Sequence, residues 1–167
     1  MNKVQESERT RTISWQDPMQ GAQLGRTMSG LDYLKAMQEG TIPPPPIAVL
    51  MNMRIAEVSE GRVVFAAEPE EYHYNPIGTV HGGLAATLLD SALACAIHST
   101  LPVGTAYTTL EIKVNYLRPM TRETGIVFCE GNVVHRGGRI ATAEGRLTDE
   151  AGKLYAHGTT TCLILRS

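Results

Sequence analysis

The sequence predicts one α+β domain in which an antiparallel sheet wraps around a single long helix. First, residues 82–99 are rich in alanine and leucine, and apolar side chains cover almost every side, which is typical of a helix enclosed by other structure. Second, two strand-like segments precede this helix and about four follow it, several of them joined by glycine-containing turns. Third, 167 residues without visible repeats suit one domain with a substantial core.

The N-terminal part of the chain contains an arm, a helix and a stiff connector. Residues 1–28 are polar and interrupted by proline and glycine, so we expect a flexible tail or arm before a domain at 29–167. Apolar residues at helical spacing predict a short helix at 29–40. The prolines at 43–46 predict an extended connector, whereas 47–53 suits either a short helix or a strand.

Alternating apolar residues predict the strands of the sheet. A hairpin with its turn at Gly61 is followed by a loop at 69–78 and then by the central helix. In the first strand after that helix, the alternation places Thr109 on the same face as Glu111 and opposite Ile112. The expected strands are 53–58, 62–68, 105–117, 125–136, 139–148 and 153–165.

Composition and charge exclude several classes of function. Hydrophobic residues make up 43% and charged residues 19%, which is a globular composition, and a net charge of −2 argues against general nucleic-acid binding. Three widely spaced cysteines favour reduced, buried thiols over disulfides or a zinc site. No secretory signal is visible, and the apolar run at 84–97 is too short to span a bilayer. We therefore expect a cytoplasmic protein that binds neither nucleic acid nor membrane.

The start of the central helix has the features of an oxyanion site. Gly82 and Gly83 stand where loop becomes helix, and the first N–H groups of a helix lack internal partners and lie at the positive end of its dipole. A ligand can approach this backbone closely because glycine has no side chain. His81 stands at the cap and can add a hydrogen bond. Asp90, in the middle of the apolar helix, costs stability unless it is paired or used.

The spacing of these residues points to a dimer. Asp90 lies nine residues after His81, which is roughly 13 Å along a helix, so its side chain cannot reach the start of its own helix. If both ends serve one reaction, two antiparallel copies of the helix about a two-fold axis would form two equal sites. Taken alone, Asp90 fits two roles equally well: a functional carboxylate, or a structural carboxylate paired with Thr87, Ser91 or a neighbouring hydroxyl. His81 alone is a helix cap, and Asn75 alone is a turn residue.

The combined pattern resembles the PaaI-type branch of the hotdog-fold acyl-CoA thioesterases. It comprises Asn75-Pro-x-Gly-x-Val-His81-Gly-Gly, Leu-Leu-Asp90 and Asn115-Tyr-Leu-Arg-Pro119, and the resemblance covers about residues 29–165. It implies a hotdog fold that dimerises edge to edge, as a homodimer or a homotetramer. It also implies hydrolysis of an acyl-CoA to the free acid and CoA. CoA is then part of the substrate, and neither a cofactor nor a metal is expected.

The resemblance also implies roles for single residues. A hydroxyl on the strand after the helix assists in the family, and it falls on Thr108 or Thr109, of which we favour Thr109. Asp90 of the partner subunit acts either as a general base on water or as a nucleophile. The helix start stabilises the oxyanion. The residues that correspond to the family's loop, helix start and helix carboxylate are Asn75, His81, Gly82, Gly83 and Asp90.

The glycine turn at Arg136-Gly137-Gly138-Arg139 is a candidate for binding the phosphates of CoA. Two guanidinium groups flank flexible backbone there, and Arg118 is a further candidate. A solvated hairpin turn is the plain alternative, and the resemblance favours CoA. Two other functions compete with hydrolysis: a hotdog-fold enoyl- or hydroxyacyl-CoA hydratase-dehydratase, and a non-catalytic acyl-CoA-binding module. The sequence does not identify the acyl group.

Overall fold

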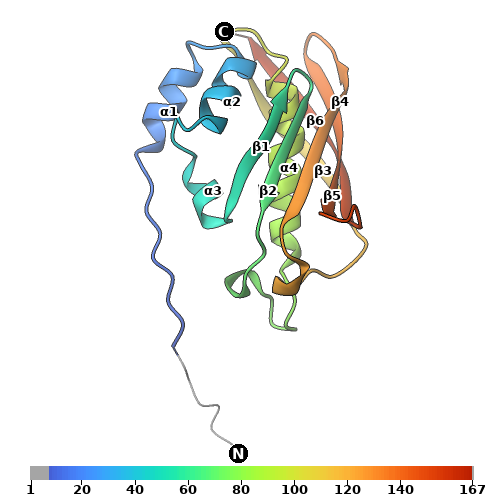
Figure 1. The fold of residues 1–167 in the computed structure, drawn as a ribbon. Coiled ribbons are helices and arrows are strands. Elements are labelled where there is room, and N and C mark those ends of the chain that lie inside the picture. Colours follow the sequence, from blue (N-terminus) through green and yellow to red (C-terminus); the bar gives the residue numbers. More distant parts are fainter. Residues whose placement is uncertain (1–7, 167) are drawn as a thin grey trace, which may run out of the picture.

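A computed structural model describes residues 8–166, and in it six antiparallel strands wrap around helix α4 (Figure 1). The strands follow the order β1-β2-β4-β5-β6-β3, so β1 and β3 are the two edges of the sheet. This is the predicted α+β hotdog architecture. The strands are β1 Met53–Ser59, β2 Arg62–Ala67, β3 Thr105–Tyr116, β4 Val127–Arg136, β5 Ile140–Asp149 and β6 Leu154–Arg166. The helices are α1 Pro18–Gly25, α2 Gly30–Gln38, α3 Pro46–Leu50 and α4 Gly82–His98, with the short 3-10 helices η1 Glu71–His73 and η2 Arg122–Thr124.

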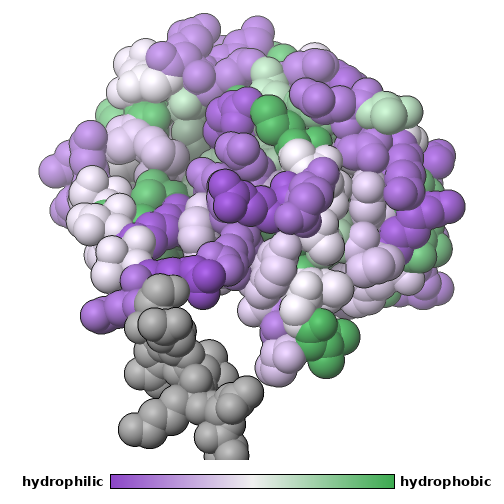
Figure 2. Space-filling model, turned by 60° about the horizontal axis from the view of Figure 1, so that its bottom comes forward, coloured by the Kyte–Doolittle hydropathy of each residue, from purple (hydrophilic) through white to green (hydrophobic). Residues whose placement is uncertain are grey.

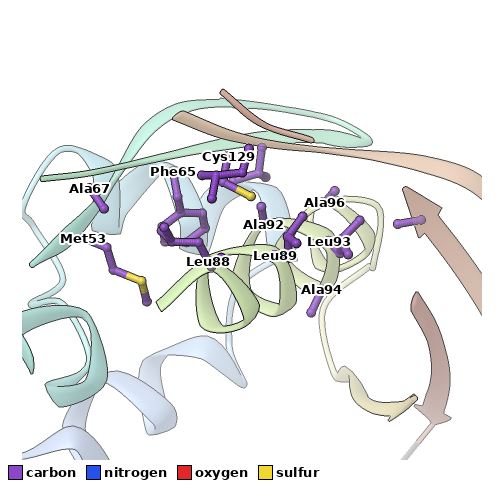
Figure 3. Packing of buried hydrophobic residues seen from close by; sticks show 14 of the residues in the cluster. Met53, Phe65, Ala67, Leu88, Leu89, Ala92, Leu93, Ala94, Ala96 and Cys129 are labelled. Carbon is purple, nitrogen blue, oxygen red and sulfur yellow. The ribbon is translucent and has the colours of Figure 1, made fainter. Parts of the chain in front are cut away.

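Helix α4 forms the centre of the core. Its residues Leu88 and Ala92 have no exposed surface, and Figure 3 shows them facing Phe65 of β2 and Cys129 of β4. The helix lies so close to β4 that a methyl group added at Gly131 would stand 2.4 Å from the carbonyl oxygen of Ala92. Glycine at this strand position therefore fixes the distance between helix and sheet. Within the described chain, no helix has the length and apolar character to cross a membrane.

The N-terminal arm is more ordered than the sequence suggested. Residues 18–25, expected to belong to a loose tail, form α1, because the Asp17 side chain accepts a hydrogen bond from the N–H of Met19 and Pro18 occupies the first helical position. Residues 1–7 of the expected tail lie outside the described residues. The predicted helix at 29–40 is confirmed as α2. Helix α3 begins at Pro46, the last residue of the predicted connector, and covers the first part of the segment at 47–53 that suited either a helix or a strand.

Two arginines hold the arm against the domain. Arg9 forms an ion pair of 2.9 Å with Glu71 of η1, and Arg11 stacks on the Tyr72 ring with its guanidinium carbon 4.0 Å from the ring centre. The same guanidinium donates hydrogen bonds of 2.7 and 2.9 Å to the carbonyls of Val49 and Leu50 at the end of α3. The arm therefore joins α3 to η1, the segment that leads into the loop before α4.

Strand β3 contains a β-bulge that changes which residues face α4. Its register with β6 shifts between Thr109 and Glu111, which leaves Leu110 as the extra residue, 55% exposed. Thr109 and Ile112 are both half-buried, and Thr109 contacts α4. The simple alternation, which placed Thr109 on the same face as Glu111 and opposite Ile112, was therefore wrong, because one extra residue reverses the facing of every side chain beyond it.

Candidate active site

The start of α4 presents two hydrogen-bond donors. His81 is the N-cap residue, and its Nδ1 accepts a hydrogen bond of 2.8 Å from the N–H of Gly83. A neutral imidazole that accepts at Nδ1 carries its proton on Nε2, so the exposed His81 ring can donate from that atom. Within residues 8–166, the N–H of Gly82 has no hydrogen-bond acceptor. The free donors at this helix start are therefore Gly82 N–H and His81 Nε2–H, whereas the cap uses Gly83.

Gly82 lies beneath an aromatic ring of the edge strand. A methyl group added at Gly82 would stand 3.1 Å from the Tyr116 ring of β3, so any larger side chain would compete with that ring for space. Gly82 and Tyr116 also line a shallow cavity of about 320 Å³, together with Arg118. The end of the molecule that carries this region is mostly hydrophilic, with separate hydrophobic residues (Figure 2).

The loop before α4 is held by Asn75 and His73. The Asn75 Oδ1 accepts hydrogen bonds from the N–H groups of Ile77 and Thr79, both 3.1 Å, and its amide donates to the Thr79 hydroxyl at 3.0 Å. This is the turn role that the residue alone predicted, and one amide hydrogen of Asn75 is left for a ligand. The carbonyl of His73 accepts from the N–H of His81 at 2.8 Å, which ties the loop to the helix start.

His73 is a positioning residue that the sequence did not identify as one. It is 9% exposed, its Nδ1 accepts a hydrogen bond of 3.0 Å from the N–H of Glu70, and its Nε2 is buried without a partner. Burial lowers the pKa of His73, with a smaller contribution from the charge of Arg11. The residue is therefore neutral at pH 7 and supports the loop through both backbone and ring. The feature of the sequence that could have indicated this role is the position of His73, two residues before Asn75.

Asp90 is held by the edge strand. The Thr109 hydroxyl donates a hydrogen bond of 3.0 Å to the Asp90 Oδ1, while Thr108 is exposed on the other face of β3. The Thr87 hydroxyl donates instead to the Gly83 carbonyl at 2.9 Å, so it does not pair with Asp90. Asp90 is half-buried, which leaves part of its carboxylate open to a ligand or to water. The catalytic role of this pair stays a prediction.

Burial raises the pKa of all three cysteine thiols. Burial raises the pKa of the Cys95 thiol to about 12, and the negative charge of Asp90 adds to the rise. Cys129 and Cys162 are buried, and burial raises their pKa as well. A thiolate nucleophile at neutral pH is therefore disfavoured at all three positions. Among the described residues, no group of three or more His, Cys, Asp or Glu side chains could hold a metal ion.

One chain carries two separate halves of the expected site. Helix α4 is continuous from its cap at His81 through Asp90, so roughly 13 Å separates them along the axis. Strand β3 runs in the opposite direction, with Thr109 beside Asp90 and Tyr116 beside Gly82. The structure therefore does not bring Asp90 to the donors of its own helix start.

The two candidate sites for CoA phosphates lie at opposite ends of the sheet. Arg118 lines the same cavity as Gly82, and its guanidinium donates a hydrogen bond of 2.6 Å to the Leu154 carbonyl. The turn at 136–139 joins β4 to β5 at the other end of the sheet, near the end of α4. At that end the N–H of Gly61 donates a hydrogen bond to the hydroxyl of Ser99, the residue after α4. Both arginines of this turn are exposed. Of these two candidate sites, Arg118 is the one that lies beside the helix start of its own chain.

Comparisons with known proteins identify the family of the chain. Residues 77–156, which include the helix start and Asp90, match the family model described as Thioesterase superfamily. Acyl-coenzyme A thioesterase 13 of Homo sapiens is 33% identical over 111 residues, which cover 66% of this chain and 78% of that protein. The matched region thus includes most of the human relative.

Two solved structures share both fold and sequence with the chain. A phenylacetic acid degradation-related protein from Ralstonia eutropha superposes with a TM-score of 0.71 at 28% identity, covering 78% of this chain and 98% of that one. A mutant of the phenylacetic acid degradation protein PaaI from Thermus thermophilus superposes with a TM-score of 0.65 at 29% identity, covering 74% of this chain and 100% of that one. The resemblance seen in the sequence is confirmed.

Proposed function

Because the chain belongs to the thioesterase superfamily, and is accordingly a thioester hydrolase, we propose that it hydrolyses acyl-CoA to a carboxylic acid and CoA. The observation that carries the proposal is the pair of half-sites on one chain. One half is the Asp90 carboxylate held by Thr109 at 3.0 Å, and the other is the pair of free donors at Gly82 and His81. A carboxylate and an oxyanion site are the two parts that thioester hydrolysis needs.

The proposed mechanism uses one half-site from each subunit. The thioester carbonyl oxygen accepts hydrogen bonds from Gly82 N–H and His81 Nε2–H, which stabilise the negative charge that develops on it. Asp90 of the partner subunit removes a proton from water, which attacks the carbonyl carbon. Alternatively it attacks directly, forming an anhydride that water then opens. In both routes the C–S bond breaks and CoA leaves as a thiolate that takes up a proton.

The proposed dimer forms along β3. This strand is an edge with unpaired backbone groups, and it exposes Leu110 by 55% and Tyr116 by 57%, as an interface strand would. Antiparallel pairing of two β3 strands about a two-fold axis near Ile112 and Lys113 places Thr109 opposite Tyr116 of the partner subunit. Asp90 then faces the partner's helix start, and the symmetry forms this site twice.

The same pairing offers a location for the CoA nucleotide. Arg118 stands beside the helix start in the same chain. Because the two β3 strands are antiparallel, the Thr105 end of the partner's β3 lies at the Arg118 end of the first chain's β3. The partner's turn at 136–139 is next to that Thr105 end, so it also comes near Arg118 of the first chain. We assign the phosphates of CoA to these guanidinium groups, which bind phosphate through paired N–H donors.

Thiol release tests the proposal. The protein is incubated with a panel of acyl-CoAs and a thiol reagent, and Asp90→Asn is expected to abolish release. Glu144→Gln, the same change at an exposed carboxylate of β5, is expected to leave it unaltered. Hydration of an enoyl-CoA with its thioester intact would indicate a hydratase-dehydratase instead. Tight acyl-CoA binding without release would indicate a binding module.

A further inference from the structure

An apolar cavity lies beside Asp90. It measures about 400 Å³, and α4 contributes Ser91, Cys95 and His98, which share one face of that helix. Ser91 is the neighbour of Asp90, and Tyr107 lies two residues before Thr109 on β3. The rest of the lining comes from α2, α3, β1, β2 and the proline connector and includes Leu34, Met37, Ile47, Ala48, Met53 and Phe65.

Three neighbouring rings, tilted against one another, separate this cavity from a second one. The second cavity, about 670 Å³, lies against α1 and the start of β3, and Tyr33, His98 and Tyr107 line both. The ring centres of Tyr33 and His98 are 5.7 Å apart, and those of His98 and Tyr107 are 5.0 Å apart. Residues that line both cavities form the wall between them, so we call these three residues the ring wall.

Helix α1 packs against the Tyr33 end of the ring wall. A methyl group added at Gly25 of α1 would stand 3.1 Å from the Tyr33 ring, so the backbone of α1 packs directly against that ring. Figure 1 shows α1, α2 and α3 together on one flank of the sheet. Burial lowers the pKa of His98, which keeps this imidazole neutral and compatible with an apolar wall. The ordered part of the N-terminal arm thus supports the ring wall at Tyr33.

We propose that the 400 Å³ cavity receives the acyl group of the substrate and that the ring wall sets the longest chain it accepts. This inference depends on the proposed acyl-CoA hydrolysis, since it places the thioester at Asp90 and the acyl chain along Ser91 and Cys95. An apolar cavity of about 150 Å³ binds benzene, so this one accommodates an aromatic acyl group or an alkyl chain of roughly ten carbons. Longer chains meet the rings.

Opposite changes to the cavity provide the test. Tyr33→Ala removes one ring and joins the two cavities, whereas Ala48→Leu places a larger side chain in the first cavity from α3. Tyr33→Phe keeps the ring and serves as the matched variant. Val134→Ala, at an exposed site on β4, controls for general effects. For each protein, kcat/KM is measured with butyryl-, octanoyl-, dodecanoyl- and palmitoyl-CoA, and folding is checked by the thermal transition.

The wild-type kcat/KM is expected to rise about fourfold per methylene, since a buried CH₂ contributes about 0.8 kcal/mol, and to fall for chains longer than the cavity. Tyr33→Ala should raise the palmitoyl-to-octanoyl ratio at least about tenfold, Ala48→Leu should lower the dodecanoyl-to-butyryl ratio, and Tyr33→Phe should keep the wild-type ratios. Unchanged ratios in active, folded Tyr33→Ala protein would overturn the ring wall, and unchanged ratios in active, folded Ala48→Leu protein would overturn the placing of the acyl group in this cavity. Neither result would overturn the proposed hydrolysis. Absence of thiol release from every acyl-CoA would overturn the proposed function together with this inference.

Discussion

Replacing Thr109 by valine tests the hydrogen bond that holds Asp90. Valine has nearly the shape of threonine, so the change removes the 3.0 Å hydrogen bond to the Asp90 Oδ1 and leaves the packing in place. A hydrogen bond to a charged group contributes about 1.5–3 kcal/mol, and if that energy acts in the transition state, kcat/KM falls roughly tenfold to a hundredfold. Steady-state thiol release from acyl-CoA measures the effect.

Two matched variants decide how the result is interpreted. Thr109→Ser keeps the hydroxyl and should stay within about threefold of the wild type, because the donor to Asp90 is retained. Thr108→Val makes the same chemical change on the exposed face of β3 and should have no effect. If Thr109→Val keeps wild-type kcat/KM, or if Thr108→Val loses as much activity, the reasoning about the bulge and the carboxylate is wrong.

Three further predictions concern stability and CoA binding. Because burial lowers the pKa of His73, its neutral form contributes its full stability above the usual pKa of 6.5, and this stability is lost as pH falls below that value. The melting temperature should therefore drop as the pH is lowered below about 6.5, and should drop less in His73→Asn. Gly131→Ala should lower the free energy of unfolding in urea by about 1–3 kcal/mol, through the contact with the Ala92 carbonyl; an unchanged midpoint would contradict the packing described. Arg118→Gln should raise KM for acyl-CoA with little change in kcat, and the difference should shrink in high salt; an unaltered KM would remove Arg118 from phosphate binding.

Local patterns in the sequence were sufficient for the main helices and strands. The apolar run of α4 and the alternation in most strands show which faces of these elements are buried. This information is contained in the residue pattern of each segment alone. The exceptions to the apolar run, among them Asp90 and His98, lie on the half-buried side of α4. The glycines after His81 marked the helix start for the same reason, since capping is a local property.

Three features were not predicted, two because they depend on contacts between distant segments and one because it depends on a side-chain rotamer. The bulge at Leu110 arises from pairing with β6, and no residue within β3 announces it. The choice of Gly82 over Gly83 as free donor depends on the rotamer of His81, whose Nδ1 occupies the Gly83 N–H. The ring wall requires α1, α2, α4 and β3 to meet, so Tyr33 and Tyr107 carried no visible signal in the sequence.

Subunit complementation tests the shared site most directly. Asp90→Asn and Gly82→Leu each remove one half-site, so each homodimer should be inactive. After the two variants are unfolded together and refolded, about half of the dimers are mixed and each has one intact site, so thiol release should recover to about one quarter of the wild-type rate. Inactivity of a mixture that demonstrably contains mixed dimers would contradict a site built from Asp90 of one subunit and the helix start of the other.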